Sequence, residues 1–125
     1  MPRTSAPVPT ARAGLGARAE TLAADYLARQ GLVVVARNFR TRRGEIDVIA
    51  RDRDTVVFVE VRLRSRAAYG GAAASITPAK RARLLAAANA YLATLARETP
   101  CRFDAILLDG LDPARIAWER DILEE

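Results

Sequence analysis

Residues 44–62, GEIDVIARDRDTVVFVEVR, decide the fold of this chain. The stretch contains two β-prone runs separated by the charged segment 52–55, and it predicts two adjacent strands joined by a turn. Each run holds one carboxylate among apolar residues, Asp47 in the first and Glu60 in the second. Burying a carboxylate without a partner is costly and tends to drive it into its neutral form. We therefore expect these two acids to have a function.

The length of the turn decides whether the two acids share a face of the sheet. If Arg51 pairs with Val56 across a four-residue turn, Asp47 lies opposite Glu60 on the same face. A three-residue turn, which pairs Arg51 with Thr55, sends the acids to opposite faces unless a bulge intervenes. A shared site therefore requires the even-numbered turn or a bulge.

Two neighbouring carboxylates are typical of a metal site. They repel each other, which raises the pKa of one of them unless a cation lies between them. Ligation by oxygen alone favours Mg²⁺ or Mn²⁺, and such an ion can activate water and neutralise charge on a phosphoryl oxygen. The alternative is a structural ion pair between Asp47 or Glu60 and one of the many arginines. The spacing of the residues leaves both interpretations open.

The basic residues of the chain favour an anionic partner. The net charge is +5 and the isoelectric point is about 10.3, and Lys80 is the only lysine among 20 basic residues. Arginine binds phosphate in a bidentate manner, so this composition raises the expectation of a nucleic-acid partner. Arginine enrichment in a GC-rich genome explains the same composition. At 125 residues the chain has the size of one domain.

Several classes of site are excluded by composition. The chain has one cysteine, Cys101, and no histidine. These counts exclude a disulfide framework, a Cys/His zinc site and serine–histidine catalysis, and they fit a reducing cytoplasm. No apolar run is long enough to span a bilayer, and residues 1–13 have no apolar signal region. We expect a cytoplasmic protein with no membrane partner, a disordered tail over residues 1–13 and a domain over 14–125.

The remaining pattern predicts an α/β domain with a mixed β-sheet flanked by helices, in the order αβββαββ. The first helix, residues 14–30, has an apolar stripe that includes Leu15, and Glu20 lies on its shoulder. Glu20 either reaches solvent or points at the sheet beside the hairpin acids. Further expected elements are a strand over 32–39, a helix that starts with Thr77 as N-cap and Pro78, and strands over 102–109 and 115–121. Asp104 and Trp118 are interpreted as structural.

Three groups of residues are candidates for nucleic-acid contacts. The segment before Gly44 forms a basic turn suited to phosphate. The start of the second helix is also basic, although the helix dipole disfavours cations there, and an incoming phosphate would reverse that penalty. Between them, Tyr69 in a glycine-rich loop could stack on a base. Solvated arginines and a packed tyrosine are the alternatives. The candidate residues are Arg40, Arg42, Arg43, Arg64, Tyr69, Arg81 and Arg83.

The order of elements and acids resembles the restriction-endonuclease-like core of the PD-(D/E)XK nuclease superfamily, particularly its Holliday-junction-resolvase-like branch. More closely, the chain resembles the YraN-like family of small bacterial proteins. The resemblance extends from Gly14 to about Asp121. It rests on Gly14-x-Gly16 with Glu20, NFR at 38–40, GEID at 44–47, FVEVR at 58–62, YGGAAASIT at 69–77 with Lys80, and CRFD at 101–104.

The resemblance implies roles for individual residues. Asp47 and Glu60 would ligate Mg²⁺ or Mn²⁺ with the Val61 carbonyl as a further ligand, and Glu20 would be the acid supplied by the helix. The nuclease signature expects lysine where this chain has Arg62. Arginine cannot lose its proton and so cannot be the base, although it can stabilise a phosphoryl transition state. The remaining source of a catalytic ammonium group is Lys80.

The implied function is that of a Mg²⁺-dependent, endonuclease-like enzyme acting on structured DNA. The alternatives are a non-catalytic DNA- or RNA-binding module with the same fold, and a protein-interaction subunit whose acids are held in ion pairs. An open pocket that unites Glu20, Asp47 and Glu60 without arginines would favour the enzyme. Arg62 or Arg43 directly in that pocket would favour the binding module.

Overall fold

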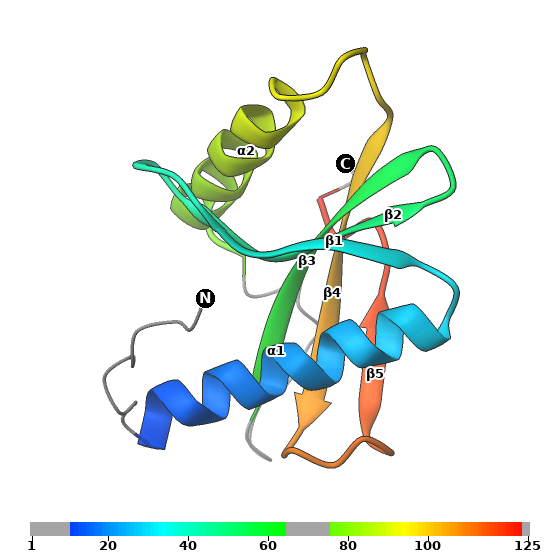
Figure 1. Ribbon diagram of the computed structural model, residues 1–125. Helices are drawn as coiled ribbons and strands as arrows, with labels where there is room; N and C mark the ends of the chain where they lie inside the picture. Colours follow the sequence, from blue (N-terminus) through cyan, green and yellow to red (C-terminus); the bar gives the residue numbers. More distant parts are fainter. Residues whose placement is uncertain (1–10, 65–75, 124–125) are drawn as a thin grey trace, which may run out of the picture.

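The computed structural model describes residues 11–64 and 76–123, with side chains from 14 to 63 and from 76 to 123. They form an α/β fold of two helices and a five-stranded mixed sheet, in the expected order αβββαββ (Figure 1). The elements are α1 (Ala11–Arg29), β1 (Val33–Arg40), β2 (Glu45–Asp52), β3 (Thr55–Arg64), α2 (Pro78–Leu92), β4 (Cys101–Asp109) and β5 (Ile116–Glu119).

The strands lie in the sheet in their sequence order, from β1 at one edge to β5 at the other. Neighbouring strands are antiparallel except β3 and β4, which are parallel. Parallel neighbours require a crossover connection. Helix α2 lies in this crossover, and it begins as expected, because Thr77 Oγ1 accepts a hydrogen bond of 3.1 Å from Lys80 N and Pro78 occupies the first turn.

Each helix covers one face of the sheet (Figure 1). The alternation of side chains along β2 and β3 supplies an apolar set to each face. The α1 face is a core of Ala19, Ala23, Leu27, Leu32, Val48, Ala50, Val57, Val59, Ile106 and Leu108. The α2 face is a core of Ile46, Ile49, Val56, Phe58, Leu84, Ala87 and Ala88.

The β2–β3 hairpin has the register that a shared site requires. Arg51 pairs with Val56, and Val48 pairs with Val59. Continuing this register by one residue places Asp47 opposite Glu60. The loop is shorter than the expected four residues, because the pairing extends one step further and leaves Arg53 and Asp54 as a two-residue turn. The number of residues in the turn is still even, so Asp47 and Glu60 still lie on the same face of the sheet.

Three expectations about individual elements need correction. Helix α1 begins at Ala11, three residues earlier than expected, since alanine and arginine favour continuation of a helix. Leu15 is 40% exposed, because the buried stripe of α1 starts only at Ala19. The apolar run at residues 33–35, which is typical of a strand covered on both faces, is partly exposed in the edge strand β1, where Val33 and Val35 are 49% and 40% exposed.

Asp104 of β4, next to the edge strand β5, is a buried acid whose side chain has no exposed surface. It accepts hydrogen bonds from Arg102 Nε at 3.1 Å, from Trp118 Nε1 at 3.0 Å and from the Asp121 backbone N–H at 3.1 Å. Arg102 also binds Asp52 of β2 at 3.2 Å. These contacts confirm the structural interpretation of Asp104 and Trp118.

No helix among the described residues is long and apolar enough to cross a membrane.

Candidate functional site

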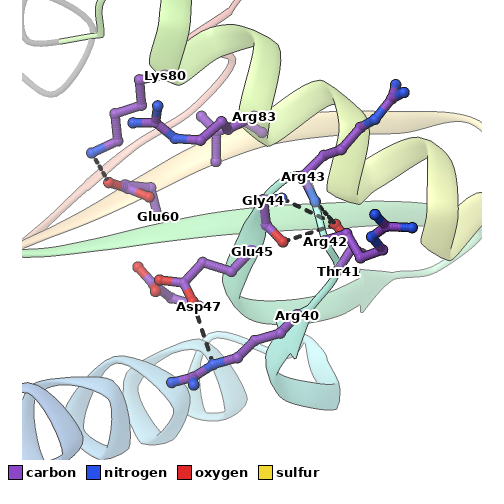
Figure 2. A pocket seen from close by; sticks show the side chains of 11 residues that line it. Arg40, Thr41, Arg42, Arg43, Gly44, Glu45, Asp47, Glu60, Lys80 and Arg83 are labelled. Atoms are coloured by element: carbon purple, nitrogen blue, oxygen red, sulfur yellow. Dashed lines mark hydrogen bonds and ion pairs between the residues drawn. The ribbon is translucent and has the colours of Figure 1, made fainter.

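A cavity of about 490 Å³ lies between the β1–β2 turn, the start of β2, the middle of β3 and the first turns of α2 (Figure 2). Acids and basic side chains lie next to one another in it: Glu60 pairs with Lys80 of α2, and Glu45 Oε1 lies 3.3 Å from Arg40 Nε of β1 (Figure 2). Its lining residues are Arg40, Thr41, Arg42, Arg43, Gly44, Glu45, Asp47, Glu60, Lys80, Arg83 and Leu84.

Asp47 lines the cavity from β2 at the point where the ladder between β2 and β3 stops. Its Oδ2 accepts a hydrogen bond of 2.8 Å from the Val61 backbone N–H, so a side chain replaces the next backbone acceptor of the ladder. Burial raises the pKa of Asp47 to about 7, against the lowering effect of this hydrogen bond, and the charges of Glu60, Glu20 and Glu45 add to the rise. The carboxylate is thus destabilised in its ionised form.

Glu60 lines the same cavity from β3, and its side chain is only 11% exposed. It forms an ion pair with Lys80 Nζ from α2 (Figure 2). Arg62 Nε lies 3.2 Å from Glu60 Oε2. The Arg62 Nε is buried and makes no hydrogen bond of good geometry. Two cations from different elements therefore share one carboxylate, and α2 brings the Lys80 ammonium group to Glu60.

Glu20 points at the sheet rather than into solvent. Its side chain is 15% exposed, and Oε1 accepts a hydrogen bond of 2.8 Å from Asn38 Nδ2 of β1. Arg37 NH2 lies 3.8 Å from the same oxygen. Glu20 does not line the cavity, but its charge contributes to the raised pKa of Asp47. The helix acid is therefore an electrostatic neighbour of the hairpin acids.

The basic turn between β1 and β2 is fixed by its own backbone and by α2. Thr41 Oγ1 accepts hydrogen bonds from the N–H groups of Arg43 and Gly44, both at 3.1 Å, and donates one of 3.0 Å to the Gly44 carbonyl (Figure 2). Gly44 packs so closely on α2 that a Cβ there would overlap the Arg83 carbonyl. Arginines of the turn are thereby held beside the first turns of α2.

The structure brings together most of the residues expected at the site. Asp47, Glu60 and Lys80 line the cavity, as do the arginines at 40, 42, 43 and 83. Three expected residues lie outside the lining: the Val61 N–H binds Asp47, Arg62 pairs with Glu60, and the charge of Glu20 adds to the raised pKa of Asp47. Arg81 is on α2 outside the lining. The side chain of Arg64 and the whole of Tyr69 lie outside the described residues.

The cavity does not meet the condition stated above for the enzyme, because Glu20 is outside the lining and arginines are part of it. It meets the condition for the binding module, since Arg43 lines the cavity, and Arg62 pairs with Glu60 from outside the lining. Asp47 and Glu60 nevertheless share this one cavity, as the enzyme requires. Among residues 11–64 and 76–123, no three His, Cys, Asp or Glu side chains are grouped so as to hold a metal ion. The metal ligation by Asp47, Glu60 and the Val61 carbonyl stays a prediction.

Several residues of the site were not assigned a role from sequence. Thr41, Glu45 and Leu84 line the cavity, and Asn38 holds Glu20. The sequence could have pointed to two of them, because Glu45 belongs to the GEID motif and Asn38 to the NFR motif. No motif role in the sequence pointed to Thr41 and Leu84 as lining residues, since their place in the lining depends on how α2 packs on the turn.

Comparison with known proteins places the chain among relatives of its own size. The model of the uncharacterised protein family UPF0102 matches residues 19–108. A UPF0102 protein of Nitrosomonas europaea is 51% identical over 110 residues, which are 88% of this chain and 93% of the relative. A UPF0102 protein of Cupriavidus taiwanensis is 56% identical over 108 residues (86% and 80%), and one of Ralstonia nicotianae is 52% identical over 121 residues (93% and 91%).

Proposed function

We propose that the chain, which belongs to the uncharacterised protein family UPF0102, is a cytoplasmic Mg²⁺- or Mn²⁺-dependent endonuclease-like enzyme of the PD-(D/E)XK type that acts on structured DNA. One observation supports this proposal above the others. Asp47 and Glu60, from neighbouring strands, line one cavity together with Lys80 and a rim of arginines. The combination of paired acids, one lysine and phosphate-binding side chains suits phosphodiester hydrolysis.

The carboxylate oxygens of the cavity are donors of the kind that a hard divalent cation prefers. Burial raises the pKa of Asp47, the charges of Glu60, Glu20 and Glu45 add to the rise, and a cation between the acids would relieve their repulsion. Oxygen donors of this kind suit Mg²⁺ and Mn²⁺, which retain several waters and need few protein ligands. Asp47, Glu60 and the Val61 carbonyl would hold the ion. Its chemistry would be to lower the pKa of a bound water and to neutralise charge on the phosphoryl group.

The basic residues have two separate tasks in this proposal. Lys80 shares Glu60 with Arg62, so its ammonium group lies where it can stabilise the charge that develops on the phosphoryl oxygens. Arg62 adds a fixed positive charge but cannot accept a proton. Arg42, Arg43 and Arg83, on the rim of the cavity, bind the phosphates that flank the scissile bond.

The second candidate is a DNA- or RNA-binding module without turnover. The observation that favours it is the position of Arg43 in the lining of the cavity, together with the ion pairs that neutralise Glu60. In that case the acids would fix the arginines and the arginines would bind phosphate. Both candidates predict salt-dependent binding to nucleic acid, and only the enzyme predicts cleavage that depends on the acids.

The test is a cleavage assay with purified full-length chain on branched, duplex and single-stranded DNA, with Mg²⁺, Mn²⁺ or EDTA. Wild type is compared with Asp47→Asn and Glu60→Gln, which remove the charge but keep the shape of the side chain. Asp54→Asn and Glu98→Gln are matched controls, because both residues are exposed and lie outside the lining of the cavity.

We expect metal-dependent cleavage of branched DNA by the wild type and by both controls, and a loss of at least about 100-fold in the two site variants. Cleavage that survives both site substitutions would come from a contaminant and would end the proposal. Binding of DNA without cleavage by well-folded wild type would favour the binding module.

A further inference from the structure

Asn38 has an unusual backbone conformation in the middle of β1. Its φ is 54°, a value in the left-handed region, and the other two described non-glycine residues with positive φ lie outside the interior of any strand. Asparagine tolerates this region better than most residues do. In β1, Arg37 pairs with Val48 and Phe39 pairs with Ile46, so Asn38 lies opposite Asp47. The unusual residue is therefore the cross-strand neighbour of a proposed metal ligand.

The conformation of Asn38 changes the direction of two side chains. Successive residues of a regular strand point to opposite faces of the sheet. Here Arg37 and Asn38 both reach α1: Arg37 NH2 donates to Thr21 Oγ1 at 3.1 Å, and Asn38 Nδ2 donates to Glu20 Oε1 at 2.8 Å. The break in alternation thus allows two consecutive residues to hold the same helix.

Glu20 receives its position from these contacts. Its Oε1 has the Asn38 amide at hydrogen-bond distance and the Arg37 guanidinium at 3.8 Å, and its side chain is largely buried. One oxygen of the carboxylate is thus fixed by β1, at the strand position next to Asp47. The charge of Glu20 is among those that raise the pKa of Asp47.

We propose that Asn38 is a positioning residue, whose amide fixes Glu20 on the α1 side of the Asp47–Glu60 pair so that Glu20 acts on a divalent cation held there. The inference rests on the function proposed above and adds to it a residue that does not touch the cation. Outer-sphere partners of this kind orient the groups around a metal, and their loss typically weakens metal affinity by roughly 10- to 100-fold.

The test measures binding of Mn²⁺ alone to the metal-free, full-length chain by titration calorimetry, so that it does not depend on turnover. Asn38→Gly removes the amide and keeps access to the positive φ. Arg53→Gly is the matched control, because Arg53 has a φ of 58° at the opposite end of β2 from Asp47. We expect Asn38→Gly to weaken Mn²⁺ binding about tenfold or more and Arg53→Gly to leave it unchanged.

A double-mutant cycle separates positioning from a general structural effect. If Asn38 acts through Glu20, Asn38→Gly has no further effect on Mn²⁺ affinity in a Glu20→Gln background. A merely structural role predicts the same loss in both backgrounds. Asn38→Asp, which keeps the shape and tolerates the same backbone, is the second variant if Asn38→Gly folds poorly, and its carboxylate should repel Glu20 and also weaken binding.

The failures of the two proposals are distinguishable. Undiminished Mn²⁺ affinity in both Asn38 variants, with affinity lost in Asp47→Asn, overturns the positioning role and leaves the metal site intact. Equal losses with and without Glu20 overturn it as well. Absence of Mn²⁺ binding by folded wild type, or affinity unchanged by Asp47→Asn, overturns both.

Discussion

Gly44, in the turn between β1 and β2, lies directly against the backbone carbonyl of Arg83 on α2. A Cβ at residue 44 would be 2.7 Å from the Arg83 carbonyl carbon, inside any normal contact distance. This contact joins the basic turn to the helix that supplies Lys80, and both border the cavity. The glycine of the GEID motif is therefore needed for packing, which places the positive rim beside the acids.

Gly44→Ala should destabilise the protein by about 1–3 kcal/mol, because the atom in the way belongs to a helix backbone and cannot rotate aside. Urea unfolding of the two proteins measures the difference. Gly16→Ala is the matched control: Gly16 is exposed on α1 with nothing within 4 Å, so the same change should stabilise the protein by roughly 0.5–1 kcal/mol. Equal stability of Gly44→Ala and wild type would contradict the close contact.

Without divalent cation, the stability of the wild type should fall as the pH rises from about 4 to about 7. Burial raises the pKa of Asp47 from 3.8 to about 7, so in this window the unfolded chain has released a proton that the folded chain still binds. The stability that Asp47 contributes through this bound proton is fully present below pH 3.8, the pKa in the unfolded chain. It is lost as the pH rises to about 7, the pKa in the folded chain, and the total is up to about 4 kcal/mol.

Asp47→Asn removes this loss, so the variant should be more stable than the wild type at pH 8 and similar to it at pH 4. Urea unfolding in EDTA across this range provides the measurement. Asp54→Asn, in the exposed β2–β3 turn, should follow the wild-type curve. A parallel pH profile for Asp47→Asn and wild type would show that Asp47 ionises without difficulty in the fold.

Lys80→Ala should lower the rate of DNA cleavage by roughly 100-fold, because it removes the ammonium group paired with Glu60. Adding Arg62→Lys should restore part of the rate, since residue 62 also contacts Glu60 and would supply a lysine at the signature position. Single-turnover cleavage on branched DNA measures both. A wild-type cleavage rate in Lys80→Ala would exclude Lys80 from catalysis. If Arg62→Lys restores none of the rate, a lysine at residue 62 cannot replace the ammonium group that Lys80 supplies from α2.

Arg43→Ala should weaken DNA binding uniformly across sequences and reduce the slope of log affinity against log salt by about 1, as expected for the loss of one phosphate contact. Arg43 lines the cavity from the turn. Arg97→Ala is the matched control, because Arg97 is exposed beyond the C-terminal end of α2 and lines a different cavity. Fluorescence anisotropy between low and moderate salt gives the slopes; identical slopes for the two variants would argue against the basic turn as the contact.

Asp104→Ala should destabilise the fold by about 3–5 kcal/mol, because it leaves the Arg102 guanidinium and the Trp118 N–H without their buried acceptor. Asp112→Ala removes an exposed acid whose Oδ1 accepts from the Ala114 backbone N–H, and it should cost less than about 1 kcal/mol. Thermal and urea unfolding distinguish the two. A small effect of Asp104→Ala would mean that water replaces the carboxylate at the sheet edge.

Much of the framework follows from local pattern. The two β-prone runs of residues 44–62 and their polar turn predict the hairpin, and Thr77-Pro78 predicts the start of α2, because alternation and capping are local properties of the chain. A shared face for Asp47 and Glu60 depended on the number of residues in the turn, which the pattern left open and which the pairing of Arg51 with Val56 decides. Burial was less predictable: Val33 and Val35 are exposed because β1 is the edge strand, which a valine run does not reveal.

The sequence by itself determined two β-prone runs with one carboxylate in each, joined by a polar turn whose length would decide whether Asp47 and Glu60 share a face. Only the tertiary structure decided that Lys80 is the residue paired with Glu60 from α2, that Asn38 holds Glu20, and that Gly44 docks the basic turn on the helix. The reason is physical: strand parity is set by neighbours in the chain, whereas these three contacts join segments 18 to 39 residues apart. Their geometry depends on how the helices pack on the completed sheet.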